Sequence, residues 1–256
     1  MSSPNLAQSR KRISSQMNKA YVLGLAMMMI VALSSLLAMA APEGPTVTYI
    51  NNQTNTPDAA TVINTTGGSI TTITLNATSQ NIRWKAYVGN VSGTMTLEDA
   101  SGSTIYNWAT TYPNGEVYAT RKETTVSWAN IACANLSHIE NENRAINHTN
   151  LEDNITATFS SVVHDIFYVG TSAITSNSCR SVHTYVNSTA QSSLFEEVLL
   201  YDGTDDTNGN IVYASLLENN IYGFNNKTYD FQMIIPENGQ LGWSSSTAYY
   251  FYVELS

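Results

Sequence analysis

The sequence predicts a mainly β protein: an antiparallel β-sandwich ectodomain with one short helix, preceded by a single N-terminal transmembrane or signal-anchor helix. Three observations lead to this fold class. Residues 20–41 form an uncharged apolar run long enough to cross a bilayer. From Thr46 onward, short runs rich in Thr, Val, Ile, Tyr and Phe alternate with Asn, Gly, Ser and Asp, as in all-β domains. Only residues 137–147 have a helical pattern after the apolar run.

The apolar run fixes the expected location. It follows a basic leader, residues 1–19, and no acidic residue occurs before Glu43. By the positive-inside rule the leader stays in the cytoplasm and the chain after Pro42 is exported, anchored in the cell membrane with an extracellular C-terminal domain. Two alternatives remain open. Cleavage near Ala40, where Ala38-Met39-Ala40 resembles a signal-peptidase site, would give a secreted protein, and a pilin-type leader would be cut before the apolar helix.

The exported part, residues 42–256, is strongly acidic. It holds all 20 acidic residues and seven of the 11 basic ones, a formal net charge of −13. Nucleic acid and anionic lipid surfaces both attract basic proteins, so neither is an expected partner. Charged residues make up only 12% of the chain, about half the usual share. Solubility must therefore come from uncharged polar groups or from glycans.

Acceptor sites for N-linked glycans are frequent in this exported part. The Asn-x-Ser/Thr pattern occurs nine times, at Asn52, Asn64, Asn76, Asn90, Asn135, Asn147, Asn154, Asn187 and Asn226. Glycans at these positions would supply the hydration that charge does not. The alternative is that some of these asparagines only serve turns and strand ends.

The two cysteines, Cys133 and Cys179, also lie on the exported side, where disulfides persist. An even count without a CxxC pattern predicts one bridge between them. The alternative, a zinc site shared with His164 and His183, lacks the spacing of zinc ligands.

The first exported segment, residues 42–79, is predicted to be a Thr/Asn-rich extended region. Its runs TVTYI (46–50) and ITTITL (70–75) predict two edge strands, half exposed to solvent. The remaining residues, 80–256, are predicted to form the β-sandwich ectodomain. A faint internal similarity allows two subdomains hinged near 130–155.

The first half of the ectodomain has clear strand patterns. Strands are predicted at 82–89 and 116–121, with a hairpin between them from 94 to 108. Trp84, Tyr106 and Trp108 are expected to fill the core, and an exposed aromatic platform for sugars is the alternative.

The one predicted helix covers residues 137–147. Ser137 and Glu140 form a capping-box pattern at its start. His138 and Glu142 are four residues apart and could hold a metal, but this spacing is more typical of a solvated helix face.

The C-terminal half predicts a series of strands at hairpin-like intervals: 165–170, 181–186, 196–202, 210–216, 229–236 and 248–255. Between two of them lies an acidic loop with clustered oxygen ligands and a glycine. Asp202, Asp205, Asp206 and Asn208 make this loop the candidate calcium site, although it lacks EF-hand spacing and resembles an ordinary long hairpin loop.

No catalytic signature is present. The chain has no Gly-x-Ser-x-Gly, no His-Glu-x-x-His and no glycine-rich phosphate loop. Glu196 and Glu197 are adjacent, so in a strand they face opposite sides and cannot act as a pair. We expect no enzyme activity and no cofactor other than calcium in the acidic loop.

Several segments resemble known sequences. The block WKAYVGNVSGTMTLEDASGSTIYNW (84–108), the run YDFQMIIPENG (229–239) and the ending YYFYVEL (249–255) are similar to those of a group of uncharacterised archaeal membrane-anchored surface proteins. The resemblance covers most of the chain after about Gln80. It implies an archaeal cell envelope, and it implies no activity, ligand or site residue.

Three functions are compatible with these features. The first is a non-catalytic, membrane-anchored, N-glycosylated surface protein with a structural or cell-contact role, whose partners are envelope proteins, glycans or copies of itself. The second is a filament subunit in which residues 43–55 pair with the open sheet edge of a neighbour. The third is a surface module that binds carbohydrate or calcium. The filament function predicts that the run 46–50 leaves its own domain.

Overall fold

A computed structural model of the chain describes residues 41–110, 112–203, 210–239 and 246–256. The predicted membrane helix, except Ala41, therefore lies outside the described residues. Within those ranges, no helix is both long and apolar enough to cross a membrane. Residues 41–256 cluster as one unit, and the account below concerns this unit alone.

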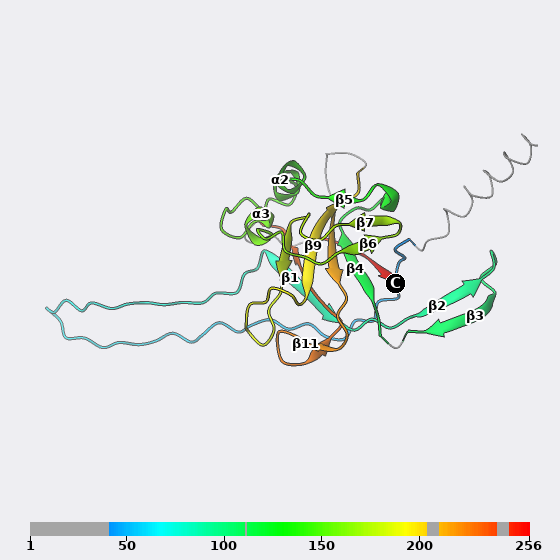
Figure 1. Cartoon of the computed structure of the whole chain (residues 1–256). Coiled ribbons are helices and arrows are strands. Elements are labelled where there is room, and N and C mark those ends of the chain that lie inside the picture. Colours follow the sequence, from blue (N-terminus) through cyan, green and yellow to red (C-terminus); the bar gives the residue numbers. More distant parts are fainter. Residues whose placement is uncertain (1–40, 111, 204–209, 240–245) are drawn as a thin grey trace, which may run out of the picture. The chain divides into compact units, whose positions relative to one another are not determined.

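The largest sheet has six antiparallel strands (Figure 1). In spatial order they are β14 (Tyr250–Leu255), β4 (Gly115–Thr120), β10 (Ile211–Leu216) and β9 (Glu196–Tyr201), followed by β5 (Ala132–Cys133) and β8 (Ser181–His183). Both of these last strands pair with β9, β5 with its C-terminal end and β8 with its N-terminal end. Strands β9 and β10 are buried along almost their whole length, including Glu196 and Glu197 at the start of β9.

Four two-stranded antiparallel sheets surround this main sheet. They are β1 (Trp84–Gly89) with β13 (Phe231–Pro236), β2 (Thr94–Glu98) with β3 (Thr104–Ala109), β6 (Phe167–Val169) with β7 (Ser172–Ile174), and β11 (Ile221–Tyr222) with β12 (Thr228–Tyr229). The prediction of a mainly β protein with antiparallel sheets is thus confirmed, and most predicted C-terminal strands are present within a few residues of their expected bounds.

Both faces of the main sheet are buried. On one face Leu199 and Tyr213 pack with Met233 and Ile235 of β13 and with the helices α2 and α3. On the other face Val198 and Val212 pack with residues of β6 and β7. The main sheet is therefore the middle of three layers, and both cores draw residues from either side of the segment 130–155.

The helix α2 (Leu136–Ala145) confirms the predicted helix, but its cap differs from the prediction. Asn135 is the N-cap: its side-chain oxygen accepts from the His138 amide, and His138 Nδ1 accepts from the Asn135 amide. The capping-box prediction for Ser137 and Glu140 was therefore wrong by two residues, because Asn135 is as good a cap as serine and begins the helix earlier. A second, shorter helix, α3 (Ile155–Thr158), and a 3₁₀ turn (Trp128–Asn130) were not predicted.

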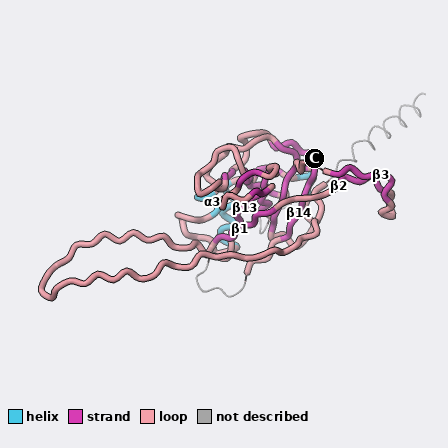
Figure 2. The backbone as a smooth tube through the Cα atoms, turned by 90° about the horizontal axis from the view of Figure 1, so that it is seen from below, coloured by secondary structure: helices cyan, strands magenta, loops and turns pink. Residues whose placement is uncertain are grey.

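The prediction of strands at 46–50 and 70–75 was also wrong. Residues 44–80 form no strand and are exposed throughout, and Figure 2 shows this stretch as continuous loop. Strand-forming residues need a neighbouring strand for their hydrogen bonds, and within the described part of the chain none pairs with this segment.

The predicted hairpin is present as β2 and β3, but its aromatic residues do not fill a core. Tyr106 is 59% exposed and Trp108 49% exposed, so their predicted core positions were wrong. Trp84 does pack against the first core, and its indole N–H donates to the Asp153 carbonyl at 2.7 Å.

Candidate interaction site

The segment 44–80, called the arm from here on, carries apolar side chains that no part of its own domain covers. Val47 is 71% exposed, Tyr49 76% and Ile50 86%. Further along the arm Ile70 and Leu75 are exposed as well. Apolar surface on this scale normally marks an interface with another molecule.

The arm leaves the domain beside β14, the outermost strand of the main sheet. The Glu43 amide donates to the Val253 carbonyl at 3.0 Å, and the Val253 amide donates to the Glu43 carbonyl at 2.8 Å. Antiparallel pairing would place residue 45 opposite Phe251 as the next hydrogen-bonded pair. Residue 45 is a proline, which has no N–H to donate, so the pairing ends after one bridge.

Side chains on both faces of β14 are incompletely covered. Phe251 and Val253 are half-buried against the first core, and Tyr252 is half-buried against the second. Tyr250, at the start of the strand, is 42% exposed. Tyr87 of β1 meets Phe251 edge to face, with ring centroids 4.9 Å apart. This edge of the sheet therefore exposes apolar groups together with main-chain groups.

Beneath this edge lies a pair of buried carboxyl groups. Glu116 of β4 and Glu254 of β14 are directly opposite each other, and both are buried. The Tyr118 hydroxyl lies 3.3 Å from Glu116 Oε2 and 3.0 Å from Glu254 Oε2, and the Gly170 amide donates to Glu254 Oε1 at 2.8 Å. A hydroxyl has one proton, so both contacts are satisfied only when one carboxyl is protonated.

The protonated group is identified by its surroundings. Burial, and secondly the negative charge of Glu254, raise the pKa of Glu116 from 4.5 to about 8. Burial also raises the pKa of Glu254, although the Gly170 and Tyr118 hydrogen bonds oppose this rise. Glu116 is therefore the carboxyl that holds a proton at neutral pH.

The opposite edge of the main sheet is closed by the predicted disulfide, which is confirmed. Cys133 ends β5 and Cys179 lies two residues before β8; their Cα atoms are 5.0 Å apart and 46 residues apart in sequence. The bridge joins the two short strands that share the edge of β9. Between them, the Ala134 amide donates to the Leu199 carbonyl, and the Leu199 amide donates to the Arg180 carbonyl.

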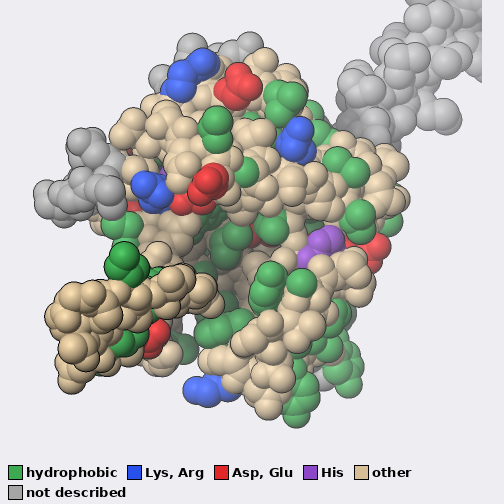
Figure 3. All heavy atoms as spheres, turned by 90° about the vertical axis from the view of Figure 1, so that its left-hand side faces the viewer, with side chains coloured by type: hydrophobic (Ala, Val, Ile, Leu, Met, Phe, Trp, Pro, Cys, Tyr) green, Lys and Arg blue, Asp and Glu red, His purple; other side chains and the backbone are tan. Residues whose placement is uncertain are grey.

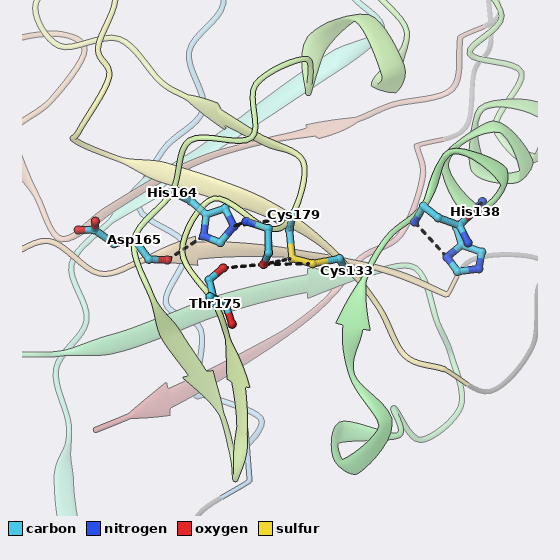
Figure 4. The surroundings of a disulfide bond; sticks show 8 residues. Cys133, His138, His164, Asp165, Thr175 and Cys179 are labelled. Atoms are coloured by element: carbon cyan, nitrogen blue, oxygen red, sulfur yellow. Dashed lines mark hydrogen bonds between the residues drawn. A yellow bond between two sulfur atoms is a disulfide. The ribbon is translucent and has the colours of Figure 1, made fainter.

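His164 lies next to this disulfide, and hydrogen bonds engage both of its ring nitrogens (Figure 4). Its Nδ1 donates to the Asp165 carbonyl at 2.7 Å, and its Nε2 accepts from the amides of Ser178 and Cys179 at 3.1 and 3.0 Å. The zinc alternative does not fit, because the cysteines are bonded to each other and the ring nitrogens of His164 are both engaged. In the described ranges no cluster of three His, Cys, Asp or Glu residues could hold a metal.

The candidate calcium loop is only partly described. Asp202 is fully buried and forms an ion pair with Lys122. Asp205, Asp206 and Asn208 lie outside the described residues. Asp202 therefore has a structural role as the partner of Lys122.

Other buried charges also serve the fold. Glu142 of α2 forms a two-pronged ion pair with Arg121, at 2.6 and 2.9 Å. Glu196 and Glu197 face opposite sides of β9 as predicted: Glu196 accepts from the Asp165 amide, and Glu197 accepts from the Ile234 amide of β13. Burial raises the pKa of Glu197 well above its usual value.

The asparagines predicted as glycan acceptors differ in exposure. Asn52, Asn64 and Asn76 are in the arm, and Asn90, Asn135, Asn147, Asn187 and Asn226 are exposed on the domain. Asn154 is buried, and its side chain accepts from the Ala157 amide as the N-cap of α3. On the face shown in Figure 3, charged side chains are few and separated, in keeping with the sequence composition.

The carboxyl pair was not predicted from the sequence, because Glu116 and Glu254 are 138 positions apart and only the strand register brings them together. Comparison with family models, with curated proteins and with solved structures found no match for this chain. The arm and the sheet edge are therefore the features that bear on function.

Proposed function

We propose that the protein is a non-catalytic structural protein of the cell surface whose copies assemble with one another, the arm of one copy adding a strand to a neighbour. The observation that carries this proposal is the exposure of Val47, Tyr49 and Ile50 in a run of strong strand formers. In an extended peptide bound at a sheet edge, main-chain hydrogen bonds supply affinity and alternate side chains supply specificity.

A second exposed region supports assembly. The hairpin of β2 and β3 is exposed on all its residues and carries Met95, Leu97 and Ile105 together with the Tyr106–Trp108 ring pair. A two-stranded hairpin is only marginally stable alone in water. A neighbouring copy packed on it would bury these side chains. The two rings meet edge to face, at 63°, which does not form the flat surface that stacks on a sugar.

The proposal keeps the location and modification that the sequence predicts. The apolar run at 20–41 anchors the chain in the membrane, or is removed near Ala40 to release it. Glycans occupy exposed acceptor sites, which provide hydration on a surface that has few charges. The resemblance of several segments to a group of uncharacterised archaeal membrane-anchored surface proteins points to the same location.

The test is the assembly state of the full chain, expressed in a glycosylating archaeal host and examined at the cell surface by negative-stain electron microscopy. The Thr48→Pro variant introduces a residue that cannot donate a main-chain hydrogen bond within residues 46–50, called the donor run from here on. Because the arm has no secondary structure of its own, this change leaves the domain folded. We expect polymers from the native chain and their loss in Thr48→Pro.

The matched control is Thr61→Pro, which makes the same change in the arm outside the donor run. It should assemble like the native chain. Single copies of the native chain at the cell surface would contradict the proposal and leave a monomeric anchored protein. Equal assembly of both proline variants would show that the donor run is not the contact.

A further inference from the structure

We propose that the acceptor for the donor run Thr46–Ile50 is the outer edge of β14, at Tyr250 and Phe251, on a second copy of this chain. This inference rests on the proposed assembly function and adds the location of its binding site. The arguments come from main-chain hydrogen bonding, from side-chain burial and from the opposite edge of the same sheet.

The single bridge at Val253 shows which main-chain groups of β14 point outward. Both main-chain groups of Val253 point outward to Glu43. In an antiparallel ladder such groups alternate along the strand, so those of Phe251 also point outward. In the part of the chain that the structure describes, no main-chain hydrogen bond joins Phe251 to a segment on that side. A donor strand would use these unpaired groups.

An added strand would also cover side chains that β14 leaves partly exposed. An added strand next to β14 places alternate side chains over each face of the sheet. On one face, side chains of the added strand would cover Phe251 and Tyr87. On the other face, they would cover Tyr250 and Tyr252. All four residues are incompletely buried in the single chain. Val47 and Tyr49 share one face of the donor run, so they would form the apolar contact on one of these faces.

The opposite edge of the sheet provides an internal precedent. There two short collinear segments, β5 and β8, each pair with half of β9. On the β14 edge the bridge at Glu43 already occupies the position of one such segment, beside Val253. The donor run of a neighbouring copy, placed beside Tyr250 and Phe251, would be the second short segment at this edge.

A chain cannot fill its own acceptor in this way. Its donor run begins one residue after Pro45, the residue whose missing N–H ends the pairing with β14. The donor therefore leaves the edge at the point where the acceptor starts, and a second copy must supply the strand. A contact between different surfaces of identical copies, donor to acceptor, links many copies into a filament or closes them into a ring.

The test is site-specific cross-linking between two versions of the full chain in the same cells. One version carries Tyr49→Cys in the donor run, and the other carries Tyr250→Cys on β14. The native cysteines are joined to each other and do not react. After treatment with a short bismaleimide, we expect a cross-linked dimer, roughly tenfold more abundant than with a distant cysteine, because pairing raises the local concentration.

The matched control replaces Tyr250→Cys by Tyr168→Cys on β6, another half-exposed tyrosine of the domain. If the yield of cross-linked dimer with Tyr168→Cys equals or exceeds the yield with Tyr250→Cys, the acceptor assignment is overturned. If the native chain forms polymers that Thr48→Pro abolishes, while Tyr250→Cys yields no cross-link, the acceptor is wrong and the proposed function stands. If no polymers form, the proposed function fails, and the acceptor fails with it.

Discussion

The two edges of the main sheet differ in how the chain completes them. At the β9 edge, β5 and β8 pair with the strand along its length, and the Cys133–Cys179 bridge joins them. At the β14 edge, among the described residues, only Glu43 pairs with the outer side of the strand, through two hydrogen bonds. An exposed strand edge invites pairing with another chain, and proteins usually protect it. The contrast indicates that the β9 edge is closed for stability and the β14 edge is kept open for a partner.

Buried polar groups lie at both edges. At the closed edge the His164 ring makes three hydrogen bonds, whereas His183 Nε2 and Glu197 Oε1 have no hydrogen-bond partner among the described residues. At the open edge two carboxyl groups, Glu116 and Glu254, share one tyrosine hydroxyl. Like charges placed directly opposite each other in a sheet are destabilising. The carboxyl pair at the open edge should therefore make stability respond to pH.

The largest effect should come from breaking the closed edge. In the Cys133→Ser/Cys179→Ser double variant the two short strands lose their covalent connection. The chain-entropy model gives a loss of about 4 kcal/mol in the free energy of unfolding for a loop of this length. Urea denaturation of the full chain in detergent, followed by tryptophan fluorescence, measures the change.

The reduced native protein serves as the control for this variant, because it lacks the same bond without any substitution. Both should unfold at the same, lower urea concentration. A double variant as stable as the oxidised native chain would mean that β5 and β8 remain in place without the bridge.

The next effect should come from the carboxyl pair at the open edge. The pKa of Glu116 is higher in the folded chain, at about 8, than its usual 4.5. The folded state therefore binds the proton more tightly, and the stabilisation is complete below about pH 4.5 and is lost as the pH rises through 8. Glu116→Gln keeps a neutral, hydrogen-bonding side chain at every pH. Relative to the native chain, the free energy of unfolding of this variant should rise by up to about 4 kcal/mol between pH 5 and pH 9.

The measurement is the thermal midpoint of both proteins across that pH range, and the control is Glu98→Gln in the exposed strand β2. The difference between the native chain and Glu116→Gln should widen with rising pH, whereas Glu98→Gln should show no such trend. Parallel curves for the native chain and Glu116→Gln would refute the shared proton.

The sequence predicted most of the sheet because its central strands carry their own signal. The runs at 196–202 and 210–216 each have an apolar centre, lie between turn residues and become β9 and β10, which are buried along almost their whole length. The disulfide was also predictable, since only two cysteines are present. The runs at 46–50 and 70–75 have the same strand-forming composition, but composition does not supply a partner strand. The carboxyl pair and the single bridge between Glu43 and Val253 depend on strand register, which the sequence does not specify.

The smallest effect should come from the single bridge at the open edge. Glu43→Pro removes the amide that donates to the Val253 carbonyl and leaves the Glu43 carbonyl in place. One exposed hydrogen bond contributes about 1 kcal/mol to the free energy of unfolding, so global stability should hardly change. The Val253 amide then donates to a partner that is held less firmly. It should therefore exchange its hydrogen roughly fivefold faster. Hydrogen exchange by NMR measures this rate, and Glu43→Ala, which keeps the amide, should exchange like the native chain. Unchanged protection of Val253 in Glu43→Pro would indicate that something other than Glu43 covers this edge, and the contrast between the two edges would then lose its basis.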